Sequence, residues 1–250
     1  MLQSFKITIA YDGTNYHGFQ KQQGTGLKTI QEVLEDCLSH LSGEKIKIIG
    51  AGRTDAGVHA LNQVINFTVS NWKIPAGRIV PALNGLLPDD IVALTAAEMP
   101  IQFHARFGAK AKTYVYTVYN HPLPSPFWRL YSYFVPRPLD VAACVEAANF
   151  LEGQHDFASF MAMANGTQPK NTVRTLYRAK VTQKDKFIYF IFQADGFLYR
   201  MVRLMSGTLL EVGKKKLAPQ EIINILNSCD RTLAGPTVPA HGLCLVKVEY

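Results

Sequence analysis

Apolar and polar positions in the first half of the chain predict a sheet with two helices. Four segments have the composition and alternation of strands: 5–11, 45–50, 62–70 and 91–97. Residues 29–41 place apolar side chains at the helical period and end before Gly43, and residues 74–86 carry a weaker helical pattern. The order strand, helix, strand, strand, helix, strand is that of a split βαβ domain.

The second half of the chain starts a similar pattern again. Four segments are predicted as strands: 112–120, 172–182, 186–193 and 243–250. Three segments are predicted as helices: 141–151, 197–212 and 219–228. The two middle strands are close enough in sequence to form a β-hairpin. We therefore expect two α/β halves of similar design, residues 1–107 and 108–250.

The composition is that of an ordinary globular protein. Of 250 residues, 48% are hydrophobic and 18% charged. No apolar run reaches the roughly 18 residues that a transmembrane helix needs, and the N-terminal segment lacks the apolar core of a signal peptide. The four cysteines are scattered without a CxxC pair, which argues against a zinc ribbon and a redox dithiol. We expect a cytoplasmic protein with no membrane partner.

The charge distribution points to a polyanionic partner. Lys and Arg number 26 against 19 Asp and Glu, which gives a net charge of +7 and a pI near 9.2. No acidic residue occurs between Glu98 and Asp140 or between Asp156 and Asp185, although basic residues fall in both stretches. Such stretches favour nucleic acid as the partner, with solvated faces of a basic protein as the alternative.

A glycine-rich cluster, residues 50–59, holds the densest candidate chemistry. It resembles a dinucleotide loop, but Asp55 replaces the third glycine and would repel a pyrophosphate. Asp55 and His59 could be two metal ligands, but no third is visible nearby, so we expect no metal. Asp55 is therefore either a turn-forming residue or a nucleophile or base beside Arg53.

Aromatic and basic side chains on two predicted strands suit RNA. Tyr114 and Tyr116 share one face of their strand, where they could stack on an unpaired base or form part of the core. By strict alternation Arg174, Arg178 and Lys180 share one face of the second strand, which suits phosphate contacts or a solvated face.

An arginine pair lies in the predicted helix 197–212. Arg200 and Arg203 are three residues apart among apolar neighbours. An arginine in so apolar a helix either extends to the surface or pairs with a buried anion.

Seven segments, in order along the chain, resemble motifs of the tRNA pseudouridine synthase A family. They are YDGTNYHGFQKQ (11–22), GRTDAGVHA (52–60), FHARF (103–107), KTYVY (112–116), HDFASF (155–160), FLYRMVR (197–203) and PAHGLCLVKVEY (239–250). Phe19 stands where the family usually has tryptophan, a change that concerns the packing of the opening loop rather than the chemistry.

The resemblance implies a fold and an activity. The fold would be α+β, with two ferredoxin-like halves of mainly antiparallel sheet joined around a central active-site cleft. The enzyme would be a homodimer without a cofactor or metal. It would isomerise uridine to pseudouridine on the 3′ side of the tRNA anticodon stem-loop (tRNA positions 38–40).

The resemblance also implies roles for single residues. Asp55, in the first half, would be the catalytic aspartate. Tyr114 would contact the target base and Arg203 would pair with Asp55, both from the second half. Arg53 would help to draw the uridine out of the helix. The basic strip that contains Arg174 and Arg178 would contact phosphates, which would offset the cost of flipping the base.

Two other functions remain open from the sequence. One is a non-catalytic tRNA-binding chaperone of similar fold, which would not need Asp55. The other is a metal-dependent enzyme of RNA processing, which a chelator would inactivate. Whether Asp55 attacks the base or assists at the sugar also does not follow from the sequence.

Overall fold

A computed structural model describes residues 2–22, 24–163 and 171–250, and it divides into two compact units. The first unit comprises Met1–Lys110 and Leu245–Tyr250, and the second Ala111–Cys244. The last six residues thus belong to the first unit, whereas the sequence pattern placed them in the second half. Side-chain contacts explain the difference, because Asn62 Nδ2 donates to the carbonyl of Val246 (2.9 Å) and Tyr250 donates to that of Ala105 (2.8 Å).

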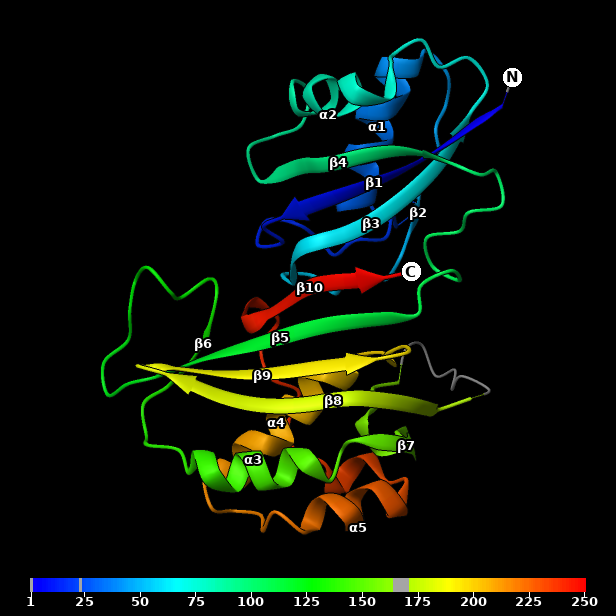
Figure 1. The fold of residues 1–250 in the computed structure, drawn as a ribbon. Helices are drawn as coiled ribbons and strands as arrows, with labels where there is room; N and C mark the ends of the chain where they lie inside the picture. The colour runs from blue at the N-terminus through cyan, green and yellow to red at the C-terminus, as the bar shows by residue number, and fades with distance from the viewer. Residues whose placement is uncertain (1, 23, 164–170) are drawn as a thin grey trace. The chain divides into compact units, whose positions relative to one another are not determined.

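The first unit is a largely antiparallel sheet with helices α1 and α2 on one face (Figure 1). Its strands are β1 (Gln3–Tyr11), β2 (Ile49–Gly50), β3 (His59–Val69), β4 (Ile91–Met99) and, from Leu245 onward, β10 (Leu243–Glu249). Its helices are α1 (Ile30–Ser42) and α2 (Ala76–Asn84). The strand order is β4-β1-β3-β10, with β2 also paired to β3. The β1, α1, β2, β3, α2, β4 succession is the predicted split βαβ order.

Alternation along β1 builds the core of the first unit. Phe5, Ile7 and Ile9 are fully buried while the residues between them are partly exposed. Phe5 lies opposite Phe67, and Ile7 opposite Ile65, in the antiparallel pairing of β1 with β3. Cross-strand pairs of this kind stabilise a sheet and set its register.

The segment 45–50 forms a shorter strand than its pattern predicts. Only Ile49–Gly50 pairs with β3. Helix α1 binds the main chain just before it: Ile46 N–H donates to Ser39 Oγ (2.9 Å) and Ile48 N–H to Glu35 Oε1 (3.1 Å). These amides are thus satisfied by side chains of a helix, and residues 45–48 lie outside the ladder.

The second unit has the same kind of architecture. Its strands are β5 (Ala111–Asn120), β6 (Tyr133–Val135), β7 (Gly153–Asp156), β8 (Val173–Lys184) and β9 (Phe187–Ala194). Its helices are α3 (Val141–Asn149), α4 (Met201–Gly213) and α5 (Glu221–Ser228). The strand order is β5-β9-β8-β7, with all three neighbouring pairs antiparallel, and β6 runs parallel to β5. The predicted α+β class with mainly antiparallel sheets is confirmed.

Helix α4 begins later than its pattern predicts. The predicted start is residue 197, but Arg200 adopts a left-handed conformation (φ +59°) and the helix runs from Met201. A left-handed residue cannot continue a right-handed helix, so residues 198–201 form a separate turn, closed by the bond from Met201 N–H to the carbonyl of Leu198 (3.1 Å). None of the helices in the described part of the chain is long and apolar enough to cross a membrane.

Candidate active site

The glycine-rich loop of the first unit, residues 51–58, joins β2 to β3 as predicted. Its entry is held by two bonds: Ala51 N–H donates to the carbonyl of Val64 (2.8 Å), and Gln63 Nε2 donates to that of Gly52 (2.8 Å). Val58 N–H donates to the carbonyl of Asp55 (3.1 Å), which closes a turn around this residue. Asp55 is half-buried. We call residues 51–58 the aspartate loop.

A second segment, residues 12–22, packs along the aspartate loop, and we call it the opening loop. Phe19 N–H donates to the carbonyl of Thr54 (3.0 Å), and Gly57 N–H donates to that of Tyr16 (3.3 Å). The Thr54 hydroxyl also bonds to that of Tyr11 (2.8 Å). The main chain is therefore held on both sides of Asp55.

Two glycines of the opening loop allow this close approach. A Cβ on Gly13 would lie 2.0 Å from the carbonyl oxygen of Val58, and one on Gly18 would lie 2.8 Å from that of Thr54. Gly18 also has a φ of +91°, which larger residues rarely adopt. The glycines in the motif are required because two main chains pass each other here without side chains between them.

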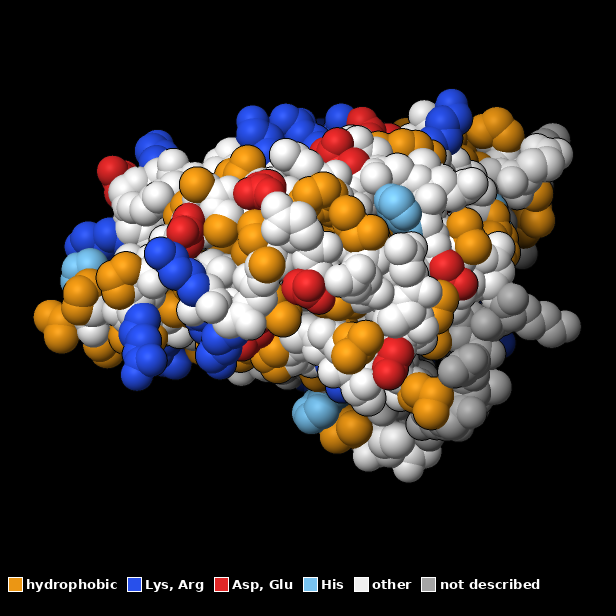
Figure 2. Space-filling model, turned by 90° about the horizontal axis from the view of Figure 1, so that it is seen from below, with side chains coloured by type: hydrophobic (Ala, Val, Ile, Leu, Met, Phe, Trp, Pro, Cys, Tyr) orange, Lys and Arg blue, Asp and Glu red, His pale blue; other side chains and the backbone are white. Residues whose placement is uncertain are grey.

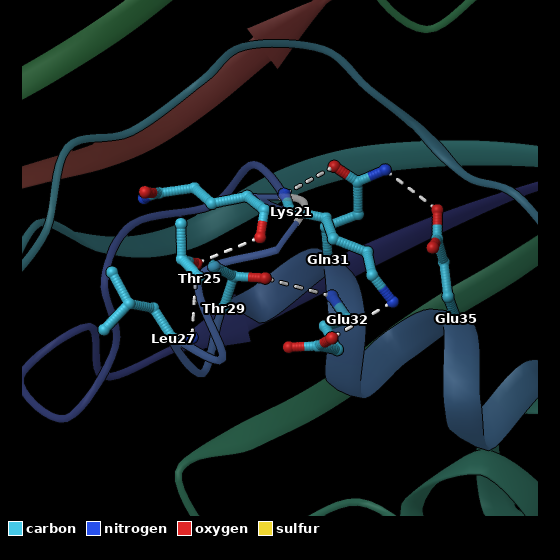
Figure 3. Close-up of polar contacts among 8 residues, drawn as sticks. Lys21, Thr25, Leu27, Thr29, Gln31, Glu32 and Glu35 are labelled. Atoms are coloured by element: carbon cyan, nitrogen blue, oxygen red, sulfur yellow. Dashed lines mark hydrogen bonds and ion pairs between the residues drawn. The ribbon is translucent and has the colours of Figure 1, made fainter.

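The opening loop is fastened in turn to α1 (Figure 3). Thr29 caps the helix by accepting the N–H of Glu32 (3.3 Å). Gln31 Oε1 accepts the N–H of Lys21 (3.0 Å), and its Nε2 donates to Glu35 (2.8 Å). Lys21 Nζ lies 3.0 Å from Glu32. A helix of the core therefore supports the loop that supports Asp55.

His59 has a different role from the one its position in the motif suggested. Its ring is 7% exposed, and its Nδ1 lies 3.1 Å from Asp12 Oδ1 and 3.1 Å from the N–H of Gly13. His59 therefore ties the end of the aspartate loop to the start of the opening loop. Among the residues that the structure describes, no group of three or more His, Cys, Asp or Glu is placed to hold a metal ion. Asp12 has no assigned role among the residues predicted from the sequence, although the DG pair in the opening motif indicates a turn there.

Phe19, the departure from the family pattern, is accommodated by the opening loop. Its ring is buried next to Gly50. A Cβ on Gly50 would lie 2.4 Å from the nearest carbon of this ring. It also contacts the ring of Tyr11, with centroids 6.5 Å apart. The ring of Phe19, smaller than that of tryptophan, thus fills the space between Tyr11 at the end of β1 and Gly50 in β2.

Arg53 is exposed at the start of the aspartate loop. Its Nη1 donates to Gln20 Oε1 (2.9 Å) in the opening loop. Arg53 and Asp55 thus lie two residues apart in the first unit, and the opening loop orients both.

Tyr114 lies on β5 in the second unit, on the same face as Tyr116. Both rings are buried, and Tyr114 meets the ring of Phe197 edge-on, with centroids 5.1 Å apart. Burial raises the pKa of Tyr116, and the Arg203 charge partly offsets this rise. The Tyr116 hydroxyl donates to the carbonyl of Pro239 (3.0 Å).

Arg203 is held by the segment that follows α5. Its Nε donates to the carbonyl of Val238 (2.8 Å), whose own N–H returns to the carbonyl of Arg203 (3.4 Å). Gly207, one turn later on α4, lets this segment approach, because a Cβ there would lie 1.8 Å from the carbonyl oxygen of Pro236. The guanidinium is therefore oriented by main-chain contacts. The predicted pair of Arg203 with Asp55 would join the two units and stays a prediction.

Arg174 and Arg178 do not share one face of β8, and the prediction that they do was wrong. Pairing with β9 shifts by one residue between Leu176 and Arg178, which is a β-bulge at Tyr177. Leu176 and Ala179 are consequently both buried, and the alternation reverses. Arg174 lies on the face of Leu176, whereas Arg178 and Lys180 lie on the opposite face.

Arg174 belongs to the face that carries Tyr114. Leu176 lies opposite Ala194, and Tyr114 lies opposite Phe192, on one face of the sheet. The Arg174 side chain passes 3.5 Å from where a Cβ on Gly196 would lie, next to Phe197. The structure thus places Arg174 and Tyr114 on one face.

Basic side chains are unevenly distributed over the face of the molecule that Figure 2 shows. In the view of Figure 2, Lys and Arg gather along the upper edge and at the left end, while acidic side chains are scattered across the middle. Clusters of positive charge of this kind attract a polyanion.

Comparisons with known proteins identify the family. The sequence profile of the tRNA pseudouridine synthase family matches residues 7–108 and 147–250. The tRNA pseudouridine synthase A of Moorella thermoacetica is 50% identical over 245 residues, 98% of both chains. That of Acetivibrio thermocellus is 46% identical over 249 residues, 100% of both chains. A solved Cbf5-Nop10-Gar1 complex overlaps 96% of this chain and 57% of that one at 10% identity, with a TM-score of 0.35, too low to support a comparison of folds.

The motifs, the profile and the full-length relatives agree, and this chain belongs to the tRNA pseudouridine synthase family.

Proposed function

We propose that this chain isomerises uridine to pseudouridine on the 3′ side of the tRNA anticodon stem-loop, with Asp55 as the catalytic nucleophile. The observation that carries the proposal is the half-buried carboxylate on a loop whose main chain is held at Thr54 and at Gly57. Aspartate has a reference pKa of ~3.9 and is almost wholly ionised at neutral pH. A nucleophile held in place reacts with little loss of entropy.

The reaction needs such a group because a bond must be exchanged while the base is held. The bond from C1′ to N1 of uracil breaks, the base turns, and a bond from C1′ to C5 forms. C5 then loses its proton and N1 gains one. The product has the same atoms and the same oxidation state as the substrate, so the proposal includes no redox cofactor, and it includes no metal.

Three residues complete the proposed site. Tyr114 contacts the target base, and Phe197 supports its ring edge-on. Arg203 pairs with Asp55. The hydrogen bond from Arg203 to the Val238 carbonyl orients the guanidinium for this pair. Arg53 helps to draw the uridine out of the stem, at a cost of a few kcal/mol.

Phosphate contacts are proposed for two further arginines, which act from different surfaces. Arg174 would contact the RNA that presents the target base, which its position on the face of Tyr114 supports. Arg178 lies on the opposite face and would meet another part of the tRNA. Binding through several such contacts is strongly dependent on salt. We also propose that the protein is a homodimer, as the family resemblance implies, and that it acts in the cytoplasm.

The test is to incubate an unmodified tRNA transcript with the wild-type protein and with Asp55→Asn, without added metal or cofactor. Pseudouridine is then mapped at nucleotide resolution. We expect modification on the 3′ side of the anticodon stem-loop by the wild type only, with similar tRNA affinity for both proteins. Equal modification by Asp55→Asn would exclude Asp55 as the nucleophile.

The same assay separates the alternatives. A tRNA chaperone would bind and refold tRNA without forming pseudouridine, and Asp55→Ala would leave its function intact. A metal-dependent processing enzyme would lose activity in excess chelator and would cleave strands. We expect full activity in chelator and intact RNA.

A further inference from the structure

An exposed aromatic ring lies in the first unit, in the turn 104–108. Phe107 is 78% exposed, and its ring packs at a tilt against that of His104, with centroids 4.4 Å apart and planes inclined by 32°. His104 Nδ1 accepts the N–H groups of Arg106 (3.2 Å) and Phe107 (3.1 Å), and Gly108 N–H donates to the His104 carbonyl (2.8 Å). The imidazole is thus locked by the turn and forms a backing for an outward-facing ring.

The turn is anchored beside the aspartate loop. Its central residue, Ala105, is fully buried in a cluster with Ala51 and Val64. Ala105 N–H donates to Asn66 on β3 (2.8 Å), and its carbonyl accepts the hydroxyl of Tyr250 (2.8 Å). Ala51 is the residue from which the aspartate loop starts. The turn with the exposed ring and the loop that carries Asp55 therefore pack on the same hydrophobic cluster.

The charge around the ring favours RNA over a protein partner. The Arg106 guanidinium lies 5.6 Å from the centre of the Phe107 ring, and Lys110 follows. No acidic residue occurs in the sequence between Glu98 and Asp140. An aromatic face with an adjacent cation suits an unpaired base and its phosphate, since every base offers a π face and stacking tolerates any sequence.

We propose that Phe107, backed by His104, is a stacking platform for an unpaired base of the RNA substrate, with Arg106 on the neighbouring phosphate. The inference rests on the proposed function, because it takes tRNA as the ligand. It adds a contact outside the residues assigned to the target uridine. Because His104 holds the ring before RNA arrives, little side-chain freedom is lost on binding.

The first test compares Phe107→Leu, which keeps the side chain apolar but removes the ring, with Phe107→Tyr, which keeps it. We expect Phe107→Leu to raise the KM for tRNA about tenfold or more, as for loss of one stacked base, with kcat little changed. Phe107→Tyr should stay within about twofold of wild type. The matched control is Phe127→Leu, which removes an 83% exposed ring from the second unit and should leave KM unchanged.

The second test is fluorescence of Phe107→Trp in the Asp55→Asn background, which needs no turnover. The chain has two tryptophans, so the parent protein supplies the baseline. We expect extra quenching when unmodified tRNA binds, since a base stacks on the new indole. This readout depends on binding alone, so it stands even where the proposed chemistry fails.

Three results would overturn the platform. One is unchanged tRNA affinity of Phe107→Leu together with no added quenching in Phe107→Trp. Another is a change in the oligomeric state of Phe107→Leu by sedimentation with tRNA affinity intact, which would make the ring part of an interface between two copies. The third is an equal rise in KM for Phe127→Leu.

Discussion

The Nδ1 atom of His59 lies 3.1 Å from Asp12 Oδ1, at the junction of the aspartate loop and the opening loop. The same Nδ1 lies 3.1 Å from the N–H of Gly13. It accepts from Gly13 only without a proton and donates to Asp12 only with one, so the two contacts compete for one atom. Asp12 Oδ1 is meanwhile held by the N–H of Thr14 (2.9 Å). His59 therefore joins the start of the opening loop to the end of the aspartate loop, which carries Asp55.

Substitution of His59 is expected to separate catalysis from binding. Asn places a polar atom near the position of Nδ1, whereas Gln places one near Nε2. We expect His59→Asn to keep kcat within a fewfold of wild type. His59→Gln should lower kcat about 10- to 100-fold with KM for tRNA little changed, because displacement of a reacting group by about 1 Å is that costly. Steady-state kinetics on tRNA measure both parameters.

The control for this prediction is Asn84→Ala, which removes two bonds between α2 and the main chain of Ala93 (2.7 and 2.9 Å) in the same unit. It should lower thermal stability without changing kcat. If His59→Gln lowers kcat no more than Asn84→Ala at matched stability, His59 has only a structural role.

Gly13 is expected to tolerate no side chain. The Cβ of Gly13→Ala would meet the carbonyl oxygen of Val58 at 2.0 Å, so one of the two loops must move. We expect a loss of roughly 1–3 kcal/mol in unfolding free energy, the range for overpacking, together with a fall in activity. Gly77→Ala in α2, where nothing lies within 4 Å of the new Cβ, should be neutral or stabilising by up to about 1 kcal/mol. Denaturant unfolding of the two variants provides the comparison.

The bulge in β8 predicts different salt dependences for two arginines. Arg174 shares the face of Tyr114, so Arg174→Ala should reduce the slope of log affinity for the anticodon stem-loop against log salt by about 0.7–0.9. Arg178→Ala should leave that slope unchanged, because Arg178 lies on the other face. Titrations of the isolated stem-loop over a range of salt measure both slopes. Equal effects would mean that the RNA wraps both faces of the sheet.

Glu211 at the end of α4 is expected to make stability depend on pH. Burial raises the pKa of its carboxyl, but hydrogen bonds from Lys214 (2.8 Å) and Lys216 (2.9 Å) outweigh this and lower the pKa below the usual value of 4.5. A carboxyl with a lowered pKa stabilises the fold above its unfolded pKa, and the contribution is lost as pH falls through the folded pKa. Glu211→Gln should therefore lower Tm at pH 7 but not near pH 3.

The matched control for this pH effect is Glu98→Gln. Glu98 is exposed and contacts the neutral side chain of Gln3 (3.5 Å). Its substitution should leave Tm unchanged at both pH values. A Tm difference for Glu211→Gln that persists at low pH would show that packing, not charge, explains the effect.

Elements with local signals could be predicted from the sequence alone. The apolar period predicted a helix over 29–41, and α1 is Ile30–Ser42, because Thr29 caps its start and Gly43 ends it in a left-handed conformation (φ +72°). The hairpin of β8 and β9 was likewise predicted, with Asp185 in a left-handed conformation (φ +52°) between the strands. The family too followed from short motifs, which do not require a structure.

Other features depend on partners distant in the sequence, and only the tertiary structure decided them. The amides of Ile46 and Ile48 bond to side chains of α1, so only the last two residues of the alternating segment 45–50 form a strand. The bulge at Tyr177 arises from pairing with β9 and moves Arg178 to the other face. The support of Asp55 comes from the opening loop, over thirty residues earlier in the chain. Periodicity reports which face a residue would take in an ideal element, whereas long-range hydrogen bonds decide where that element begins, bulges and ends.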